Sequence, residues 1–439
     1  MKKFAHEVLR QMSDMTKDAD MRSSSEPKKF NWTMMVVILT VMIDSMGIGI
    51  VIPVTPALLM DVLPGATLAE AAIWGGILTS LFSVMQFLFG PFLGTLSDQF
   101  GRKPVLMVSL FVMVGYYAVM VFAHTVWLLL LGRLIGGITA ATHATATALV
   151  ADVSAPKDKA ARFGLLGAGF GMGFVLGPVL GGMLGEWGPR APFVAAAFLS
   201  ALNFLMAWLI LPETVTDRIR RRFEWRRANP LGAIRAISQF PGLGPMLVVY
   251  LIYAIATAVY AAVWPFFTAE RFGWSPAMIG VSLTIYGVCF AIVQGALVKP
   301  AIKRFGEYKT VVIGFGFEMF GLLLMSVMTN GTILLGLIPI AALGVIGQPA
   351  LQAILSVGTS DDSQGVLQGV VASLSAISMI IAPVSMTWVF SNFTQESAAV
   401  YYPGAPFAVS ALLLALGLYI FVRKGRDIQK QPEQRTGWN

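Results

Sequence analysis

Twelve long apolar runs constrain what this chain of 439 residues can fold into. A helix needs about 20 apolar residues to cross the hydrocarbon core of a bilayer, and each run is long enough. Nine of the runs carry no Asp, Glu, Lys or Arg in their central stretch. The sequence therefore predicts an all-α membrane protein with 12 transmembrane helices. The runs cover residues 32–54, 71–93, 104–123, 125–151, 162–185, 191–212, 243–268, 276–298, 308–329, 332–357, 365–391 and 403–422.

The composition excludes an ordinary soluble domain. Hydrophobic residues make up 56% of the chain and charged residues 12%, whereas a soluble domain carries about 25% charged residues. The first apolar run follows a polar stretch without a small-residue cleavage site, so we expect no signal peptide. The single cysteine, Cys289, lies in an apolar run and excludes an internal disulfide.

The basic residues indicate how the chain is threaded through the membrane. Of the 31 Lys and Arg residues, 28 fall in six segments that 12 spans place on one side. The positive-inside rule makes that side cytoplasmic, so we expect both termini inside the cell. The net charge is +8, and we assign the basic run in the middle loop to anionic lipid rather than to nucleic acid.

The two halves of the chain match at a constant offset of 205 residues. This offset favours two homologous six-helix bundles. The matched positions are Phe100-Gly101 with Phe305-Gly306, Gly164 with Gly369, and Pro178 with Pro383. The expected domains are a cytoplasmic tail 1–31, a bundle 32–212, a cytoplasmic linker 213–242, a bundle 243–422 and a cytoplasmic tail 423–439.

The segment from Gly94 to Pro104 joins the second and third runs and combines glycine with charge. Glycine permits a tight turn and a close approach of helices. The pattern resembles the signature loop of the major facilitator superfamily, although Gln99 stands where that family usually has a basic residue. For Asp152 and Glu213, which lie at helix ends, we expect capping or loop roles. The resemblance implies a gating role for Gly94, Asp98, Gly101, Arg102 and Lys103.

The fifth run carries a second glycine pattern. Gly173, Gly177 and Gly181 recur every fourth residue and form one small-residue face on a helix. Pro178 removes a backbone hydrogen bond and permits a kink. The pattern resembles a motif of the antiporter branch of the same superfamily. It therefore favours antiport, in which substrate and coupling ion move in opposite directions, over symport. The full motif comprises Gly164, Gly173, Gly177, Pro178, Gly181 and Gly182.

The resemblance narrows to the tetracycline/proton antiporters of bacteria and covers residues 33–422. It implies a monomeric inner-membrane transporter, not an enzyme, that exports tetracycline or another hydrophobic drug in exchange for protons. It implies no cofactor and no metal site, and leaves open whether Mg²⁺ accompanies the drug as a chelate. The stretches that carry it are Ile43–Gly49, Thr139–Asp152, Gly347–Gln352 and Gln364–Gly369.

Three ionisable residues, Asp44, Arg133 and Glu318, lie inside apolar runs. Such a group costs roughly 2.5–3.5 kcal/mol at the bilayer centre, so it must be paired or line a wet cavity. The resemblance implies that acids at Asp44 and Glu318 are required for transport, and it links Arg133 to proton transfer. A carboxyl group held away from water favours its neutral form and can take up a proton, for which a cationic drug competes. His143 titrates near neutral pH and is a further candidate for relaying protons.

Each of these residues also has a structural alternative. Asp44 and Arg133 can form a static ion pair between two helices. Glu318 can be a satisfied buried acid, and His143 can serve packing or hydrogen bonding.

The substrate cavity lies, by the same resemblance, among the first, fourth, seventh and tenth helices. Each aromatic candidate there has core packing or lipid anchoring as an alternative role. The candidate contacts are Gln86, Tyr253, Tyr260, Trp264, Phe290, Gln348 and Gln352.

Two departures from the tetracycline exporters favour a different or wider set of drugs. Tyr116 stands where they carry an aspartate, and Phe290 where they carry a histidine. The main rival function is a proton-coupled metabolite or nutrient transporter of the same fold. A membrane enzyme or receptor is disfavoured, because three histidines and one cysteine offer no catalytic polar cluster.

Overall fold

A computed structural model describes residues 32–140, 142–155, 157–215 and 242–435, together with 220, 223–224, 229, 232 and 236–240. Every regular element in these residues is a helix, so the predicted all-α class is confirmed. The predicted tail 1–31 and most of the predicted linker 213–242 lie outside the described residues.

The first half of the described chain forms six long apolar helical stretches. Two of the six are interrupted, the first by a short 3₁₀ segment and the fourth by a turn. The elements are α2 (Trp32–Val51), η1 (Ile52–Val54), α3 (Thr55–Val62), α4 (Leu68–Phe100), α5 (Arg102–Phe122), α6 (Val126–Thr139), α7 (Thr142–Val153), α8 (Lys159–Gly185) and α9 (Ala191–Ile210).

The second half forms five such stretches in the described residues. It contains three 3₁₀ segments and a π-helical segment between its longer helices. The elements up to α14 are η2 (Ala236–Gln239), α11 (Gly244–Thr257), α12 (Val259–Phe272), α13 (Pro276–Ile292), η3 (Val293–Leu297) and α14 (Val298–Val327). The remaining elements are α15 (Gly331–Ala342), η4 (Leu343–Ile346), α16 (Gly347–Val357), η5 (Asp361–Ser363), α17 (Gln364–Asn392) and α18 (Ala405–Arg435).

The count of apolar stretches is therefore 11 in the described chain rather than the predicted 12. The difference arises at Pro276–Val327, a continuous helical stretch of 52 residues. At 1.5 Å per residue it would be about 78 Å long, more than twice the thickness of a bilayer core. Gly306 breaks it with φ 74° and ψ 164°, and the two pieces on either side correspond to the predicted spans 276–298 and 308–329.

Gly101 and Gly306 show that the matched positions of the two halves have matching backbones. Gly101 ends α4 with φ 111° and ψ 152°, close to the conformation of Gly306. Both conformations are ones that residues with a Cβ atom rarely adopt. The same sharp turn thus follows the second span of each half, as the 205-residue offset predicts.

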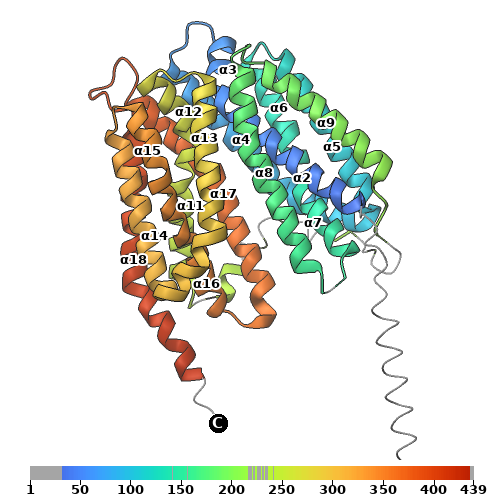
Figure 1. Cartoon of the computed structure of the whole chain (residues 1–439), viewed down its shortest axis with the longest axis vertical. Coiled ribbons are helices and arrows are strands. Elements are labelled where there is room, and N and C mark those ends of the chain that lie inside the picture. Colours follow the sequence, from blue (N-terminus) through green and yellow to red (C-terminus); the bar gives the residue numbers. More distant parts are fainter. Residues whose placement is uncertain are drawn as a thin grey trace, which may run out of the picture.

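The helices form two bundles that contact each other at one end and diverge toward the other (Figure 1). The most extensive contacts between the bundles join α4 to α17 and α8 to α13. We call the end with α3, where the bundles meet, the far end. We call the opposite end, with Arg102, Lys103, Lys303 and Arg304 in its turns, the basic end.

Four spans are divided into two α-helices by a 3₁₀ segment or a turn. They are the first, with η1, the fourth, between α6 and α7, the seventh, between α11 and α12, and the tenth, with η4. An interruption frees backbone polar groups and marks a hinge. Within a membrane such backbone is tolerated only inside the protein or along a water-filled cavity. These are the four spans predicted to line the substrate cavity.

Candidate functional site

Asp44 and Arg133 lie half-buried in the first bundle, on α2 and α6. Both side chains are described, and no ion pair joins them within 4.0 Å, so the alternative of a static ion pair finds no support. The Nε atom of Arg133 is buried without a hydrogen-bond partner, and the guanidinium carbon lies 5.8 Å from the centre of the Phe82 ring. The first bundle thus holds an acid and a base that do not neutralise each other directly.

Tyr117 on α5 connects these two charges electrostatically, because its phenol interacts with both Asp44 and Arg133. It is 3% exposed and packs beside Tyr116, with 4.8 Å between the ring centres and 51° between the ring planes. Sequence reasoning singled out Tyr116 as a departure and missed its neighbour. The sequence did contain a hint of this contact. The glycines at 47 and 49 on the first helix leave room for a large side chain from another helix, and Tyr117 is such a side chain with a polar hydroxyl.

Glu318 lies in the second bundle on α14 and is 1% exposed. Its Oε2 atom has no hydrogen-bond partner, so at least one oxygen of this buried acid is unsatisfied. η4 packs so closely here that a Cβ atom at Gly344 would come within 2.8 Å of the Cα atom of Glu318. The electrostatic neighbours of Glu318 are the phenols of Tyr253, Tyr260 and Tyr286.

A small pocket, with a cavity volume of about 20 Å³, lies beside this group of tyrosines. The Oη atom of Tyr260 is buried and faces the Glu318 carboxyl group without forming a regular hydrogen bond. Trp264 is held in place because its Nε1 atom donates to Oγ of Ser282 at 2.9 Å. The lining residues are Tyr260, Trp264, Ser282, Leu283, Tyr286, Met325 and Ile338.

The hydroxyl group of Tyr250 accepts hydrogen bonds from both predicted glutamines of the tenth span. Nε2 of Gln348 and Nε2 of Gln352 donate to its hydroxyl at 3.4 and 3.5 Å. Oγ of Ser375 on α17 lies 2.9 Å from the same hydroxyl. Sequence reasoning named both glutamines and missed Tyr250. The spacing of 348 and 352 shows that the glutamines share one helix face, but it does not show which residue of another helix they contact.

The remaining predicted contacts are dispersed. Tyr253 stacks on Phe315 with ring centres 4.9 Å apart and belongs to the core. Gln86 is exposed, and its Nε2 atom donates to the carbonyl oxygen of Ala140 at 3.3 Å, where the fourth span is interrupted. His143 is exposed and meets Phe170 edge to face at 5.3 Å. Phe290 is 39% exposed and lies 6.3 Å from Tyr286.

The charged residues of the loop after α4 form a network at the basic end. Nη1 of Arg102 lies 2.6 Å from Oδ1 of Asp98, and Nε of Arg102 lies 3.2 Å from Oδ2 of Asp152. The carboxylate of Glu213 accepts hydrogen bonds from the backbone N–H groups of Arg102 and Lys103 at 3.0 and 3.2 Å. Glu213 therefore caps α5, as expected, whereas Asp152 forms an ion pair instead. A Cβ atom at Gly94 would contact nothing within 4 Å.

The glycines of α8 allow close packing against two different helices, α2 in the same bundle and α13 in the other bundle. Cβ atoms at Gly173, Gly177 and Gly181 would collide with α2, so these glycines form the predicted small-residue face. Gly182, in contrast, faces α13 in the other bundle, where a Cβ atom would lie 2.6 Å from the carbonyl oxygen of Pro276. Pro178 lies inside α8 between these contacts, and a Cβ atom at Gly164 would meet nothing within 4 Å.

Comparison with known families matches residues 37–248 and 246–438 to the Major Facilitator Superfamily. The chain is 38% identical to the tetracycline resistance protein, class C, of Escherichia coli, over 83% of this chain and 91% of that protein. It is 36% identical to the class G protein of Vibrio anguillarum, over 88% of this chain and 96% of that protein. It is 32% identical to the class B protein of Escherichia coli, over 81% and 88% of the two chains.

Solved structures with the same architecture are also transporters. The human organic anion transporter MFSD10 gives a TM-score of 0.65 at 25% identity, covering 89% of this chain and 98% of its own. A bacterial homologue of the human lysosomal transporter Spinster, inward-facing and unoccupied, gives 0.73 at 15% identity, covering 93% and 99% of the two chains. At 15% identity this second likeness shows the fold alone.

Proposed function

This chain belongs to the major facilitator superfamily, and from that membership we propose that it exports a drug-like molecule in exchange for protons. It is a multi-pass membrane transporter rather than an enzyme. Transporters built from two repeats expose a site near the membrane midplane alternately to the two sides, as one bundle rocks against the other. The interrupted spans of this chain are suited to that motion.

The Glu318 carboxyl group carries the proposal. It is 1% exposed, and its Oε2 atom lacks a hydrogen-bond partner. An unpaired carboxylate in such a place is costly, and either a proton or a cationic substrate would relieve the cost. The two ligands then compete for one group, which is the requirement for exchange. Asp44, with Arg133 and Tyr117 nearby, supplies a second such group in the first bundle.

Tetracycline or another hydrophobic antibiotic is the proposed substrate. The similarity to tetracycline resistance proteins supports this choice. The aromatic side chains of Tyr260, Trp264 and Tyr286, beside Glu318, would offer ring faces for stacking to a planar drug admitted between them. The resemblance implies a histidine at the position of Phe290 and an aspartate at that of Tyr116 in the tetracycline exporters, so the proposal includes apolar drugs that bind no metal. We further propose a monomer without a cofactor, with Mg²⁺ taking part only in a drug chelate.

The proposed location is the bacterial inner membrane, with the basic end in the cytoplasm. The distribution of 28 of the 31 Lys and Arg residues supports this orientation. Because the bundles meet at the far end and diverge at the basic end, the structure then represents a state open to the cytoplasm (Figure 1).

Antibiotic resistance in a sensitive bacterium without its own exporters tests the proposal. The native chain is compared with Asp44→Asn and Glu318→Gln at matched membrane levels, against tetracyclines, phenicols and fluoroquinolones. Resistance is expected with the native chain and is expected to disappear in both variants and when the proton gradient is collapsed. Glu396→Gln is the matched control, because Glu396 is an exposed loop acid at the far end and its substitution should leave resistance unchanged.

Two outcomes would contradict the proposal. A well-expressed native chain that protects against no compound would argue against drug export and favour the rival metabolite transporter. Resistance that survives both Asp44→Asn and Glu318→Gln would retain export but refute these residues as the coupling groups.

A further inference from the structure

The helix α13 begins without a cap of its own. Its N-cap residue, Ser275, makes no side-chain capping hydrogen bond, and its first residue is Pro276. Proline has no N–H group, so the backbone N–H of Ala277 is the first free donor of this helix. By contrast α4, the second span of the first bundle, has a complete capping box from Thr67 and Glu70.

Glu186, from the other bundle, supplies the missing cap. It directly follows α8, and its Oε1 atom accepts the hydrogen bond of the Ala277 N–H group at 3.0 Å. The Ser275 hydroxyl lies close enough to interact with the same carboxylate. These interactions, the one from Ala277 first, hold the pKa of Glu186 below its ordinary value. A carboxylate at a helix N-terminus is further favoured by the helix dipole.

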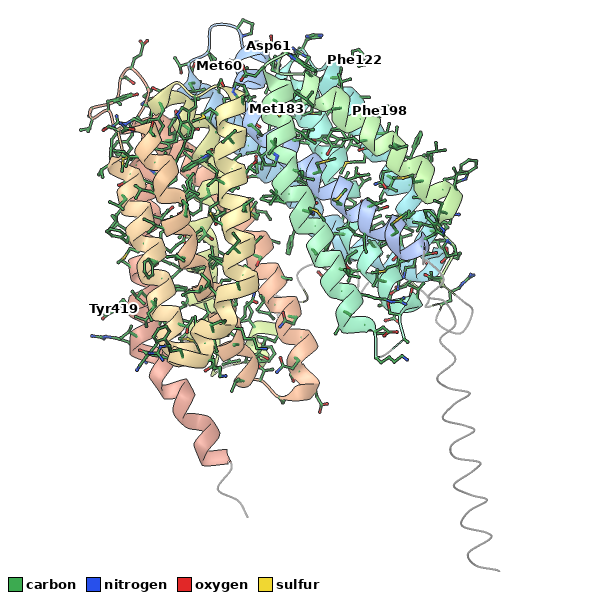
Figure 2. The ribbon with its side chains drawn as sticks, viewed as in Figure 1. Met60, Asp61, Phe122, Met183, Phe198 and Tyr419 are labelled. Carbon is green, nitrogen blue, oxygen red and sulfur yellow. The ribbon has the colours of Figure 1, made fainter. Side chains whose placement is uncertain are left out.

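Close backbone packing places Glu186 at this position. A Cβ atom at Gly182 would come within 3.1 Å of Cα of both Ala277 and Gly280, and one at Gly185 within 2.9 Å of Cβ of Pro276. The two helices thus approach through glycine and proline over their last and first turns. Met183, in this stretch of α8, lies at the far end with Asp61 and Phe122 (Figure 2).

The second contact between the bundles, α4 with α17, is built alike but without charge. A Cβ atom at Gly76 would lie 2.7 Å from the carbonyl oxygen of Pro383, and Ser80 donates to the carbonyl oxygen of Ile380 at 2.6 Å. Among the hydrogen bonds found between the bundles in the described residues, the Glu186 bond is the one made by an ionisable side chain. The two contacts that close the far end, α4 with α17 and α8 with α13, are therefore alike in their close backbone packing. They differ in charge, because in the described chain only the contact of α8 with α13 includes a carboxylate.

We propose that Glu186 is a latch that holds the far ends of the two bundles together by capping α13 across their interface. The cap exists only while the far end is closed, since opening that end separates α8 from α13. It therefore stabilises the state open to the basic end and is released and remade in every transport cycle. The latch rests on alternating access, which is part of the proposed function, but not on the identity of the substrate.

The charge state of Glu186 sets the pH range of the latch. A carboxyl group whose pKa is lowered in the closed state stabilises that state above its ordinary pKa, and this contribution is lost as the pH falls through the lowered pKa. The latch is thus engaged at neutral pH. Other charged groups at the far end have partners of their own. In the first bundle Arg190 pairs with Asp61 and also contacts His124. In the second bundle Nε of Arg271 donates to the carbonyl oxygen of Met328 at 3.2 Å, and Glu270 accepts from the Tyr401 hydroxyl at 2.8 Å.

Distances between spin labels at the far ends of the bundles test the latch. Cys289 is the single cysteine, so Cys289→Ser with Phe122→Cys and Val400→Cys gives one label in each bundle, at side chains that are 72% and 62% exposed. The labelled protein is compared with Glu186→Ala and Glu186→Gln at neutral pH. Loss of a cap and of its charge should raise the ratio of far-end-open to far-end-closed molecules about two- to fivefold, more in Ala than in Gln.

Glu70→Gln is the matched control, because Glu70 caps α4 within its own bundle and should leave the distance distribution unchanged. An unchanged distribution in Glu186→Ala, or an equal shift in Glu70→Gln, would overturn the proposal. Ser275→Ala removes the weaker interaction of the hydroxyl with Glu186 and should give a smaller shift in the same direction. The measurement needs no drug, so absence of drug export would leave its result valid.

Discussion

The phenol of Tyr117 lies directly over Gly47, where a Cβ atom would come within 3.1 Å of the Cζ atom of the ring. The missing side chain at Gly47 thus makes room for the ring that interacts with both Asp44 and Arg133. A glycine on the first helix thus positions a tyrosine on the third, and the phenol of that tyrosine interacts with both charges of the first bundle.

Gly47→Ala is expected to destabilise the protein by about 1–3 kcal/mol, the usual cost of overpacking a tight site. It should also reduce proton-coupled transport, because the ring must move from its place near Asp44. Thermal unfolding in detergent and proton-driven uptake into inverted vesicles measure the two effects. Gly115→Ala is the matched control on α5, since a Cβ atom there would meet nothing within 4 Å.

Tyr117→Phe should partly rescue Gly47→Ala, because the hydroxyl is the part of the ring nearest to the added methyl group. The double variant should therefore be less destabilised than the sum of the two single variants. Strict additivity of the two changes would show that the ring and Gly47 do not interact.

The glycines of α8 should differ sharply in their tolerance of alanine. A Cβ atom at Gly177 would lie 2.6 Å from the carbonyl oxygen of Met46, which is backbone and cannot swing aside. Gly177→Ala is therefore expected to abolish transport and lower the yield of folded protein. Gly164→Ala should be tolerated, because a Cβ atom there meets nothing. Equal effects at both positions, in a transport assay at matched expression, would contradict this distinction.

The fold was predictable from hydropathy and charge because each span must be apolar over its full length. The one discrepancy, at Pro276–Val327, reflects a turn at Gly306 so tight that the two helices run on without a loop. The recurrence of Phe-Gly at positions 100 and 305 was enough to indicate this turn. Helix interruptions such as η3 were not predictable, because they depend on packing between spans rather than on local sequence.

The candidate site was predictable only where a charge is out of place in an apolar run. Asp44, Arg133 and Glu318 stood out for that reason. Tyr117 and Tyr250 did not, since a tyrosine in a membrane helix has many ordinary roles and its partners come from other helices. Glu186 was equally hidden, because a glutamate after a helix is unremarkable until α13 is seen to lack its own cap.

Tyr250→Phe is expected to weaken substrate binding while the protein stays folded. The change removes the hydroxyl that Gln348 and Gln352 share, and frees both amide groups from their present arrangement. The expected result is a raised KM with little change in maximal rate, measured by drug uptake into inverted vesicles. Ser385→Ala is a suitable control, because the Ser385 hydroxyl bonds only to carbonyl oxygens of its own helix. A fall in maximal rate alone would indicate a role for Tyr250 in the conformational change instead.

Alanine at the two turn glycines should separate backbone strain from the cap that Glu213 provides. Gly101 and Gly306 both have positive φ, so alanine at either should cost about 1–2 kcal/mol of stability. Gly101→Ala should cost more, because its Cβ atom would also come within 2.7 Å of the Cδ atom of Glu213, whereas one at Gly306 meets nothing. When each change is combined with Glu213→Ala, the two glycine substitutions should lower the stability by similar amounts, because the carboxylate that only Gly101→Ala would meet is gone. Thermal unfolding of the four variants in detergent measures this, and a difference that persists without the Glu213 carboxylate would refute the assignment.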